Sequence, residues 1–159
     1  MVGIDLKHEQ RLLVRNFKRQ GILDNHFDQI LEIATPENPR FMLEVMMVFL
    51  NDADHCVSEL NRLLNIEAAV DYGLVINYCH QLKGSTASIG ARLVAIACRE
   101  LRIATNEMAT NEMNKDRCLE AFGKLKDAYQ ILKNSLNIII QIERTIVANS
   151  DRRRRNTRP

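Results

Sequence analysis

Proline, glycine and tryptophan are scarce in this chain of 159 residues. It contains three prolines, six glycines and no tryptophan. The prolines are Pro36, Pro39 and Pro159, so residues 40–158 contain no strong helix breaker. Sustained β-type alternation is also missing, whereas apolar residues recur at three- and four-residue steps. Together these patterns predict an all-α chain.

Long apolar runs and closely spaced cysteines are missing as well. The longest aliphatic runs, such as Ile138–Ile140, fall far short of the roughly 20 apolar residues that a membrane span needs. No basic start followed by an apolar segment marks a secretory signal. The four cysteines lie about twenty residues apart without a CxxC pair: Cys56, Cys79, Cys98 and Cys118. We therefore expect an intracellular protein that has no membrane contact and whose reduced thiols fill the core.

The positive charge of the chain is concentrated at its end. The net charge is +2, but residues 152–158 hold five of the 22 lysines and arginines. The remaining 17 basic residues face 20 acidic ones, and no cluster of basic residues is evident among them. We therefore expect no specific nucleic-acid binding. Residues 150–159 are interpreted as an Arg-rich, disordered tail, with a nuclear import signal or a segment added for expression as alternatives.

Six helices are predicted, the last four long enough for an antiparallel four-helix bundle with the first two packed alongside. The domain spans residues 6–149. Its predicted helices cover Leu6–Arg19, Ile22–Ile33, Pro39 or Arg40 to Leu64, Asp71 (as N-cap) to about Gly90, a segment around Leu93–Ala104, and Lys115–Ala148. Residues 104–108 and 109–113 repeat the pentapeptide ATNEM, which is too short for a solenoid unit and indicates a lengthened helix end or loop.

One histidine lies on the wrong side of its predicted helix to be a core residue. On a helical wheel the fourth helix directs one apolar arc of about 100° at the core. That arc holds Leu74, Val75, Tyr78, Leu82 and Ile89. His80 lies about 170° from its centre, so its imidazole is expected to face water or a partner. Its five neighbours on that face are Gly73, Ile76, Lys83, Gly84 and Ala87, of which three are glycine or alanine.

Gly84 and Lys83 indicate a chemical role for the face that carries His80. A glycine inside a helix costs roughly 1 kcal/mol against alanine, and no core packing requires one here. A side chain at Gly84 would obstruct whatever approaches the imidazole one turn away. The ammonium of Lys83, three residues from His80, could stabilise a dianion carried on the ring. Taken singly, each residue could equally be an ordinary surface position.

These residues form a motif. The segment His80-Gln81-Leu82-Lys83-Gly84-Ser85 resembles the HxxKG core of histidine-containing phosphotransfer (HPt) domains. The wider stretch HQLKGSTASIGA, residues 80–91, is similar to the plant phosphotransmitters of cytokinin-type multistep phosphorelays. The resemblance covers roughly residues 10–149 and includes Gly21–Asp24, Asn38-Pro39 and Cys98. It departs from the family pattern at Thr86-Ala87, where serines are common, and in the Arg-rich tail.

The resemblance implies a phosphoryl carrier without kinase activity of its own. His80 would accept a phosphoryl group from a receiver-domain aspartate of a hybrid histidine kinase and pass it to the aspartate of a response regulator. Lys83 would stabilise the negative charge of the phosphoryl group, and Gly84 would leave room for the receiver domain to approach His80. No cofactor is expected in the chain, because Mg²⁺ belongs to the receiver domain. The resemblance also implies a monomer located in the cytoplasm and the nucleus.

The receiver domain is expected to dock on the face around His80, on the second helix and on the start of the third. Apolar contacts are assigned to Ile76, on the His80 face, and to Phe27 and Ile30, because a short second helix cannot bury every side. The other contacts are assigned to Asp24, Gln81, Ala87 and Ser88.

Three other readings compete with this one. The pairs His55-Cys56 and Cys79-His80 offer zinc-ligand types, but adjacent helical residues diverge by about 100° and do not converge on one ion. A helical adaptor, in which His80 is a plain surface residue as in pseudo-HPt proteins, is the main alternative. The four arginines Arg152–Arg155 could also attract nucleic acid weakly.

Overall fold

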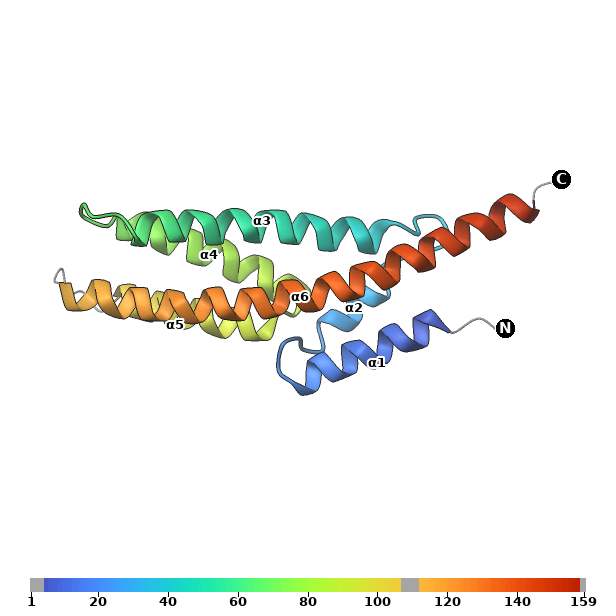
Figure 1. Ribbon diagram of the computed structural model, residues 1–159, viewed down its shortest axis with the longest axis horizontal. Helices are drawn as coiled ribbons and strands as arrows, with labels where there is room; N and C mark the ends of the chain where they lie inside the picture. The colour runs from blue at the N-terminus through green and yellow to red at the C-terminus, as the bar shows by residue number, and fades with distance from the viewer. Residues whose placement is uncertain (1–4, 107–111, 158–159) are drawn as a thin grey trace.

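The computed structural model describes residues 5–106 and 112–157, and within them it contains six helices and no strand (Figure 1). The helices are α1 (Leu6–Arg19), α2 (Phe27–Leu31), α3 (Phe41–Leu64), α4 (Tyr72–Ile89), α5 (Arg92–Asn106) and α6 (Glu112–Thr157). The all-α prediction is confirmed. None of the helices in these ranges is long and apolar enough to cross a membrane. Part of the ATNEM repeat lies outside the described residues, so its interpretation stays a prediction.

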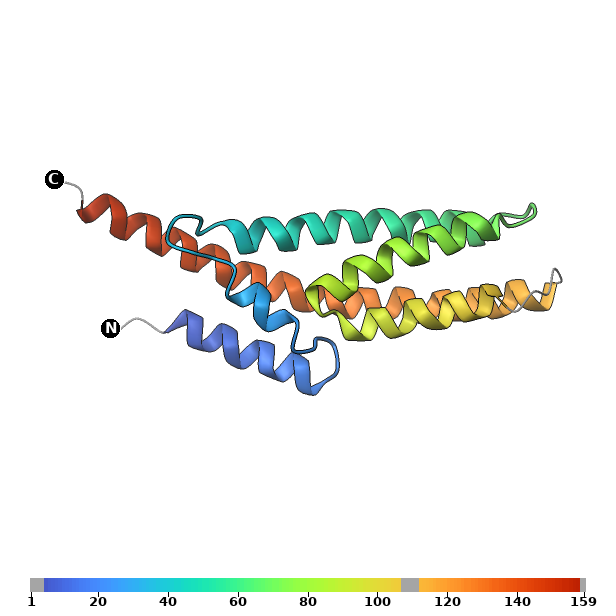
Figure 2. The same ribbon diagram turned by 180° about the vertical axis from the view of Figure 1, so that it is seen from behind.

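Helices α3 to α6 form the four-helix bundle. Each packs against two others, in the ring α3–α4–α5–α6 that α3 and α6 close. Helix α1 packs against the C-terminal half of α6, and α2 lies between α1 and α3 (Figure 2). Each bundle helix contributes one of the four cysteines to the core, and all four are free thiols, as the sequence predicted: Cys56, Cys79, Cys98 and Cys118.

Side-chain caps and one glycine set the limits of α4. Asp71 accepts a hydrogen bond from the backbone N–H of Leu74 at 3.1 Å, which confirms it as the N-cap. Gly90 ends the helix in the left-handed conformation with φ +75°. The backbone N–H of Asp24 donates to the Gly90 carbonyl at 2.8 Å. This bond ties the segment before α2 to the end of α4 and places it near the candidate site.

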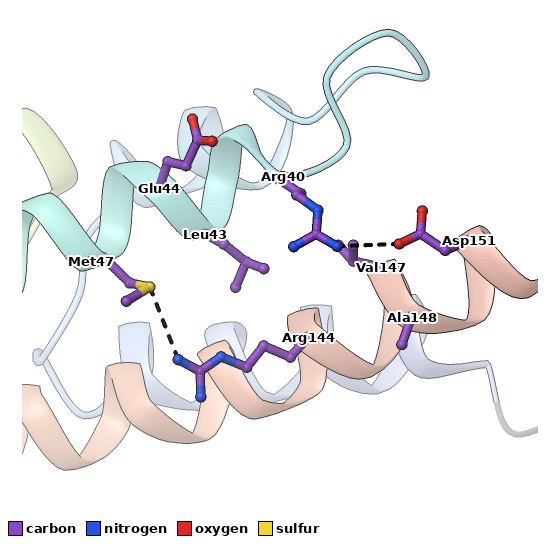
Figure 3. A pocket seen from close by; sticks show the side chains of 8 residues that line it. All are labelled: Arg40, Leu43, Glu44, Met47, Arg144, Val147, Ala148 and Asp151. Carbon is purple, nitrogen blue, oxygen red and sulfur yellow. Dashed lines mark hydrogen bonds and ion pairs between the residues drawn. The ribbon is translucent and has the colours of Figure 1, made fainter.

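The end of the chain differs from the prediction, because α6 continues as a helix to Thr157. The disordered tail expected over residues 150–159 is therefore wrong for the residues up to 157. Asp151 pairs with Arg40 at 3.3 Å, and the guanidinium of Arg154 donates to the Pro36 carbonyl. Arg40 and Asp151 line a hollow of about 410 Å³, in which Arg144 lies beside the sulfur of Met47 at 4.0 Å (Figure 3). Tertiary contacts thus hold a segment that local composition suggested was free.

Candidate functional site

Helix α4 presents one face to the core and the opposite face to solvent. Its buried side chains are Val75, Cys79, Leu82, Thr86 and Ile89. The predicted core arc is therefore rotated by about 50° from the observed one. Leu74, expected in the core, is 40% exposed, and Tyr78 is half-buried with its ring edge-on to His55 on α3. The difference arises from the position of α3, which a helical wheel drawn for α4 alone does not include.

His80 is exposed in the middle of α4, as expected. Its ring forms no hydrogen bond or ion pair with any residue that the structure describes. The ring of His26, by contrast, contacts the Asp24 carboxylate at 3.1 Å, and the ring of His55 packs against that of Tyr78. A neutral imidazole has one ring nitrogen with a free lone pair, and at His80 nothing within the described fold occupies it.

The strip around His80 is open. Lys83, Gly84 and Ala87 are exposed, and Ile76 is half-buried. A Cβ added at Gly84 would meet no atom within 4 Å. The glycine is therefore not required by the packing of this chain, and the free volume it leaves lies on the solvent side of α4. Lys83 follows His80 by three residues, about one turn along α4.

The hydroxyl groups that follow His80 are bonded within their own helix. Ser85 donates to the Gln81 carbonyl at 3.1 Å, Thr86 to the Lys83 carbonyl at 2.9 Å and Ser88 to the Ser85 carbonyl at 2.7 Å. Thr86 is fully buried, so this half of the departure from the family pattern faces the core, whereas Ala87 is exposed on the strip around His80. Gln81 and Ser88 are exposed at the border of the strip.

A groove of about 360 Å³ runs between the start of α3 and the end of α4, next to this strip. Its lining includes Val45 and Phe49 of α3 and Ser85, Ser88 and Ile89 of α4. Phe41 and Val48, also in the lining, are 41% and 58% exposed. Sequence reasoning missed Val48. The available signal was that residues 41–50, FMLEVMMVFL, are apolar on nearly every side, which a helix packed on one face does not need.

Helix α2 does not supply the apolar contact that the sequence predicted. Phe27 is 0% exposed and Ile30 only 4%, and both belong to the core. The predicted role of Phe27 in partner binding is therefore wrong. Asp24 is half-exposed, but its carboxylate accepts the backbone N–H of His26 at 2.8 Å and so shapes the turn before α2. The apolar surface available to a partner lies on α3 instead.

Zinc-ligand types do not gather in the described residues. Cys56 and Cys79 lie in the core, whereas His80 points outward. No group of three or more His, Cys, Asp or Glu side chains in the described ranges is placed to hold a metal ion.

Known proteins resemble this chain over nearly its whole length. Residues 44–135 match the model of the Hpt domain. Histidine-containing phosphotransfer protein 1 of rice is 31% identical over 148 residues, which cover 93% of this chain and 97% of the rice protein. Pseudo histidine-containing phosphotransfer protein 6 of Arabidopsis thaliana is 29% identical over 143 residues, or 89% of this chain and 90% of that protein. The crystal structure of a histidine-containing phosphotransfer protein from maize superposes with a TM-score of 0.75 at 32% identity, covering 89% of this chain and 99% of the maize chain.

Proposed function

This chain belongs to the Hpt-domain family of plant histidine-containing phosphotransfer proteins, and we propose that its own phosphoryl carrier is His80. The observation that carries the proposal is an exposed imidazole without a partner in the described fold, placed one turn from an open glycine and a lysine. The family acts as phosphoryl carriers rather than kinases. We assign the chain to the cytoplasm and the nucleus, as expected from the sequence.

The proposed reaction is a pair of reversible displacements. A ring nitrogen of His80 attacks the phosphorus of a receiver aspartyl phosphate, the P–O bond breaks, and the aspartate carboxylate leaves. In the second step a carboxylate of another receiver attacks the phosphorus, the P–N bond breaks, and the imidazole leaves. Such transfers need in-line positioning and charge neutralisation more than covalent machinery. Lys83 supplies positive charge on this chain, and the Mg²⁺ site belongs to the receiver.

Replacing His80 tests the assignment directly. The variant His80→Gln should lose all uptake from a phosphorylated receiver domain, measured as acid-labile phosphate on the protein. Its melting temperature should remain nearly unchanged, because an exposed substitution away from any contact usually costs under about 0.5 kcal/mol. The matched control is His8→Gln, which removes another exposed histidine and should retain uptake.

Labelling of His80→Gln at an acid-labile site would assign the carrier to another residue. A wild-type chain that takes up no phosphate would favour the adaptor role of the pseudo type.

We further propose that the receiver docks across the His80 strip and the groove beside it. The partners are receiver domains of hybrid histidine kinases and of response regulators. Ile76 of α4 and Val48 of the groove provide apolar contact area, and Asp24, Gln81, Ala87 and Ser88 are proposed as the further contacts. An apolar centre with a polar border is the usual composition of a specific interface.

Charged substitutions at the apolar positions test this surface. Val48→Glu and Ile76→Glu should each weaken binding of the receiver domain by at least tenfold, because a carboxylate would lose its hydration in the interface. Calorimetric titration with a receiver domain measures the effect. The control is Ile131→Glu, at an exposed isoleucine of α6 with 45% exposure. Equal affinities for Val48→Glu, Ile76→Glu and the control would remove this surface from the proposal.

A further inference from the structure

The exposed face of α1 is basic along its whole length. Lysine or arginine occupies every fourth position from residue 7 to residue 19, and Lys18 and His8 fall within the same arc of about 120°. No acidic residue of α1 lies in that arc. The opposite face buries Val14 and Phe17, and the Gln10 amide donates to the Glu143 carboxylate of α6 at 3.0 Å. The folded part therefore does contain a basic cluster, contrary to the sequence analysis, because cations four residues apart share a face only once the helix forms.

Four of the five lysines and arginines of α1 form no ion pair within the described part of the fold. Lys18 pairs with Asp28 of α2 at 2.8 Å. The other four form no ion pair with any residue in the described part of the chain: Lys7, Arg11, Arg15 and Arg19. Like charges four residues apart on a helix repel each other, and a cation in the first turn, such as Lys7, is disfavoured by the helix dipole. An anion bound along the row would relieve this repulsion.

The end of α6 adds further positive charge. Helix α6 packs against the buried face of α1, and its last turns, which carry Arg152–Arg155, all exposed, continue past the beginning of α1 (Figure 1). Helix α1 and residues 140–157 together contain ten of the 22 lysines and arginines but three of the 20 acidic residues. These two segments thus carry a net charge of +7, and the rest of the chain carries −5. His80, on α4, belongs to the oppositely charged part.

The composition of the surface points to a phosphate polyanion. Eight of its ten cations are arginines, whose planar guanidinium binds phosphate through two parallel hydrogen bonds. The apolar face of α1 is already buried against α6, and Leu12 is its one large apolar side chain that is strongly exposed. Helix α1 therefore exposes too few apolar side chains to insert into a membrane.

We propose that α1 and the end of α6 bind the phosphate backbone of double-stranded nucleic acid without sequence preference. The two segments expose no aromatic side chain for base stacking, which single-strand binders use, so the contacts are with the backbone. This inference does not rest on the phosphotransfer function of His80. Because the surface lies on other helices, it leaves the His80 strip free.

The test measures binding of the full chain to a fluorescent 20-base-pair duplex of random sequence at several salt concentrations. If the four unpaired cations of α1 and two arginines of α6 contact phosphates, log K should fall with log salt with a slope of about −5. Arg11→Gln/Arg15→Gln/Arg19→Gln should reduce that slope by about 3 and weaken binding at least tenfold. The matched control Arg92→Gln/Arg99→Gln/Lys124→Gln removes the same charge from exposed positions outside the surface and should change the slope by less than one.

Three results would overturn the proposal. The first is no binding to the duplex at about 50 mM salt, where phosphate contacts are strong. The second is an equal loss in the control, which would show that net charge alone matters. The third is tighter binding to vesicles containing phosphatidylserine than to the duplex at equal charge concentration, which would assign the surface to a membrane. Circular dichroism of both triple variants checks that α1 remains helical.

Discussion

Gly84 is the residue whose presence the fold explains least. It lies inside α4 on the exposed face, and a side chain there would meet no neighbouring atom. Glycine is among the poorest residues for a helix interior, so the position lowers the stability of the protein without any packing gain. We propose that the explanation lies outside the chain, in the room that an incoming receiver aspartate would need beside His80.

Gly84→Gln should therefore move stability and function in opposite directions. The free energy of unfolding in urea should rise by roughly 0.5 kcal/mol, because glutamine is the better helix former. The rate of transfer to His80 should fall at least tenfold, because in-line attack tolerates little displacement. Gly123→Gln is the matched control: this glycine of α6 also has open space at its Cβ, so the variant should gain stability and keep normal transfer. Normal transfer by Gly84→Gln would show that the glycine is only a weak point of the helix.

The junction of α4 and α5 is the element on which the position of α2 depends. Gly90 has φ +75°, and a Cβ there would lie 2.8 Å from the backbone nitrogen of Phe27 and closer still to the Asp24 carboxylate. Glycine is thus required twice, once for the backbone conformation and once for the close approach of the chain before α2.

Comparing two glycine variants separates these requirements. Gly21→Ala has the same left-handed backbone, with φ +76°, but no atom within 4 Å of the added Cβ, so it should cost about 1–2 kcal/mol. Gly90→Ala should cost clearly more, because residues 24–27 must also shift. Urea unfolding measures both free energies. Equal losses in the two variants would mean that the segment before α2 yields without cost, and that it is not held at α4.

Local signals predicted most of the helices because those signals lie within the elements themselves. Helix α1 has the predicted bounds, and the Asp71 cap and Gly90 stop are readable from the sequence. Helix α2 is shorter than expected, and α6 is longer because Arg40 and Pro36 hold residues after 150. These outcomes depend on tertiary contacts, which periodicity does not contain.

In the candidate site, too, features that depend on one helix could be predicted and features that depend on tertiary contacts could not. The exposure of His80 and the open strip at Gly84 could be predicted, because both depend on one helix alone. The burial of Phe27 depends on how α2 sits on α3, and the groove at Val48 exists only where α3 and α4 meet. A wheel drawn for one helix cannot locate its neighbours, so the partner surface was predicted only in part.

At the scale of the whole molecule, the bundle separates a neutral thiol core from a charged exterior. Each of α3, α4, α5 and α6 places one cysteine inside, and burial raises the pKa of the Cys79 and Cys98 thiols to about 12. Burial also raises the pKa values of Cys56 and Cys118. At neutral pH the core therefore holds no thiolate, and the cysteines act there as small apolar side chains.

These shifted thiols predict that stability falls at alkaline pH. In the unfolded chain the Cys79 and Cys98 thiols have the ordinary cysteine pKa of 9.0, whereas in the folded protein their pKa is about 12. The folded state then binds more protons than the unfolded state, so the free energy of unfolding declines as pH rises from about 9 toward 12, by up to about 1.4 kcal/mol per pH unit for each thiol. The stabilisation is fully present below about pH 9. Urea unfolding at pH 7.5, 9 and 10, in the presence of reductant, measures the decline.

The double variant Cys79→Ala/Cys98→Ala should be less stable at pH 7.5, because it leaves cavities, but should lose less stability between pH 9 and 10. The lysines and tyrosines are common to both proteins, so parallel declines would show that the two thiols do not contribute to the alkaline transition.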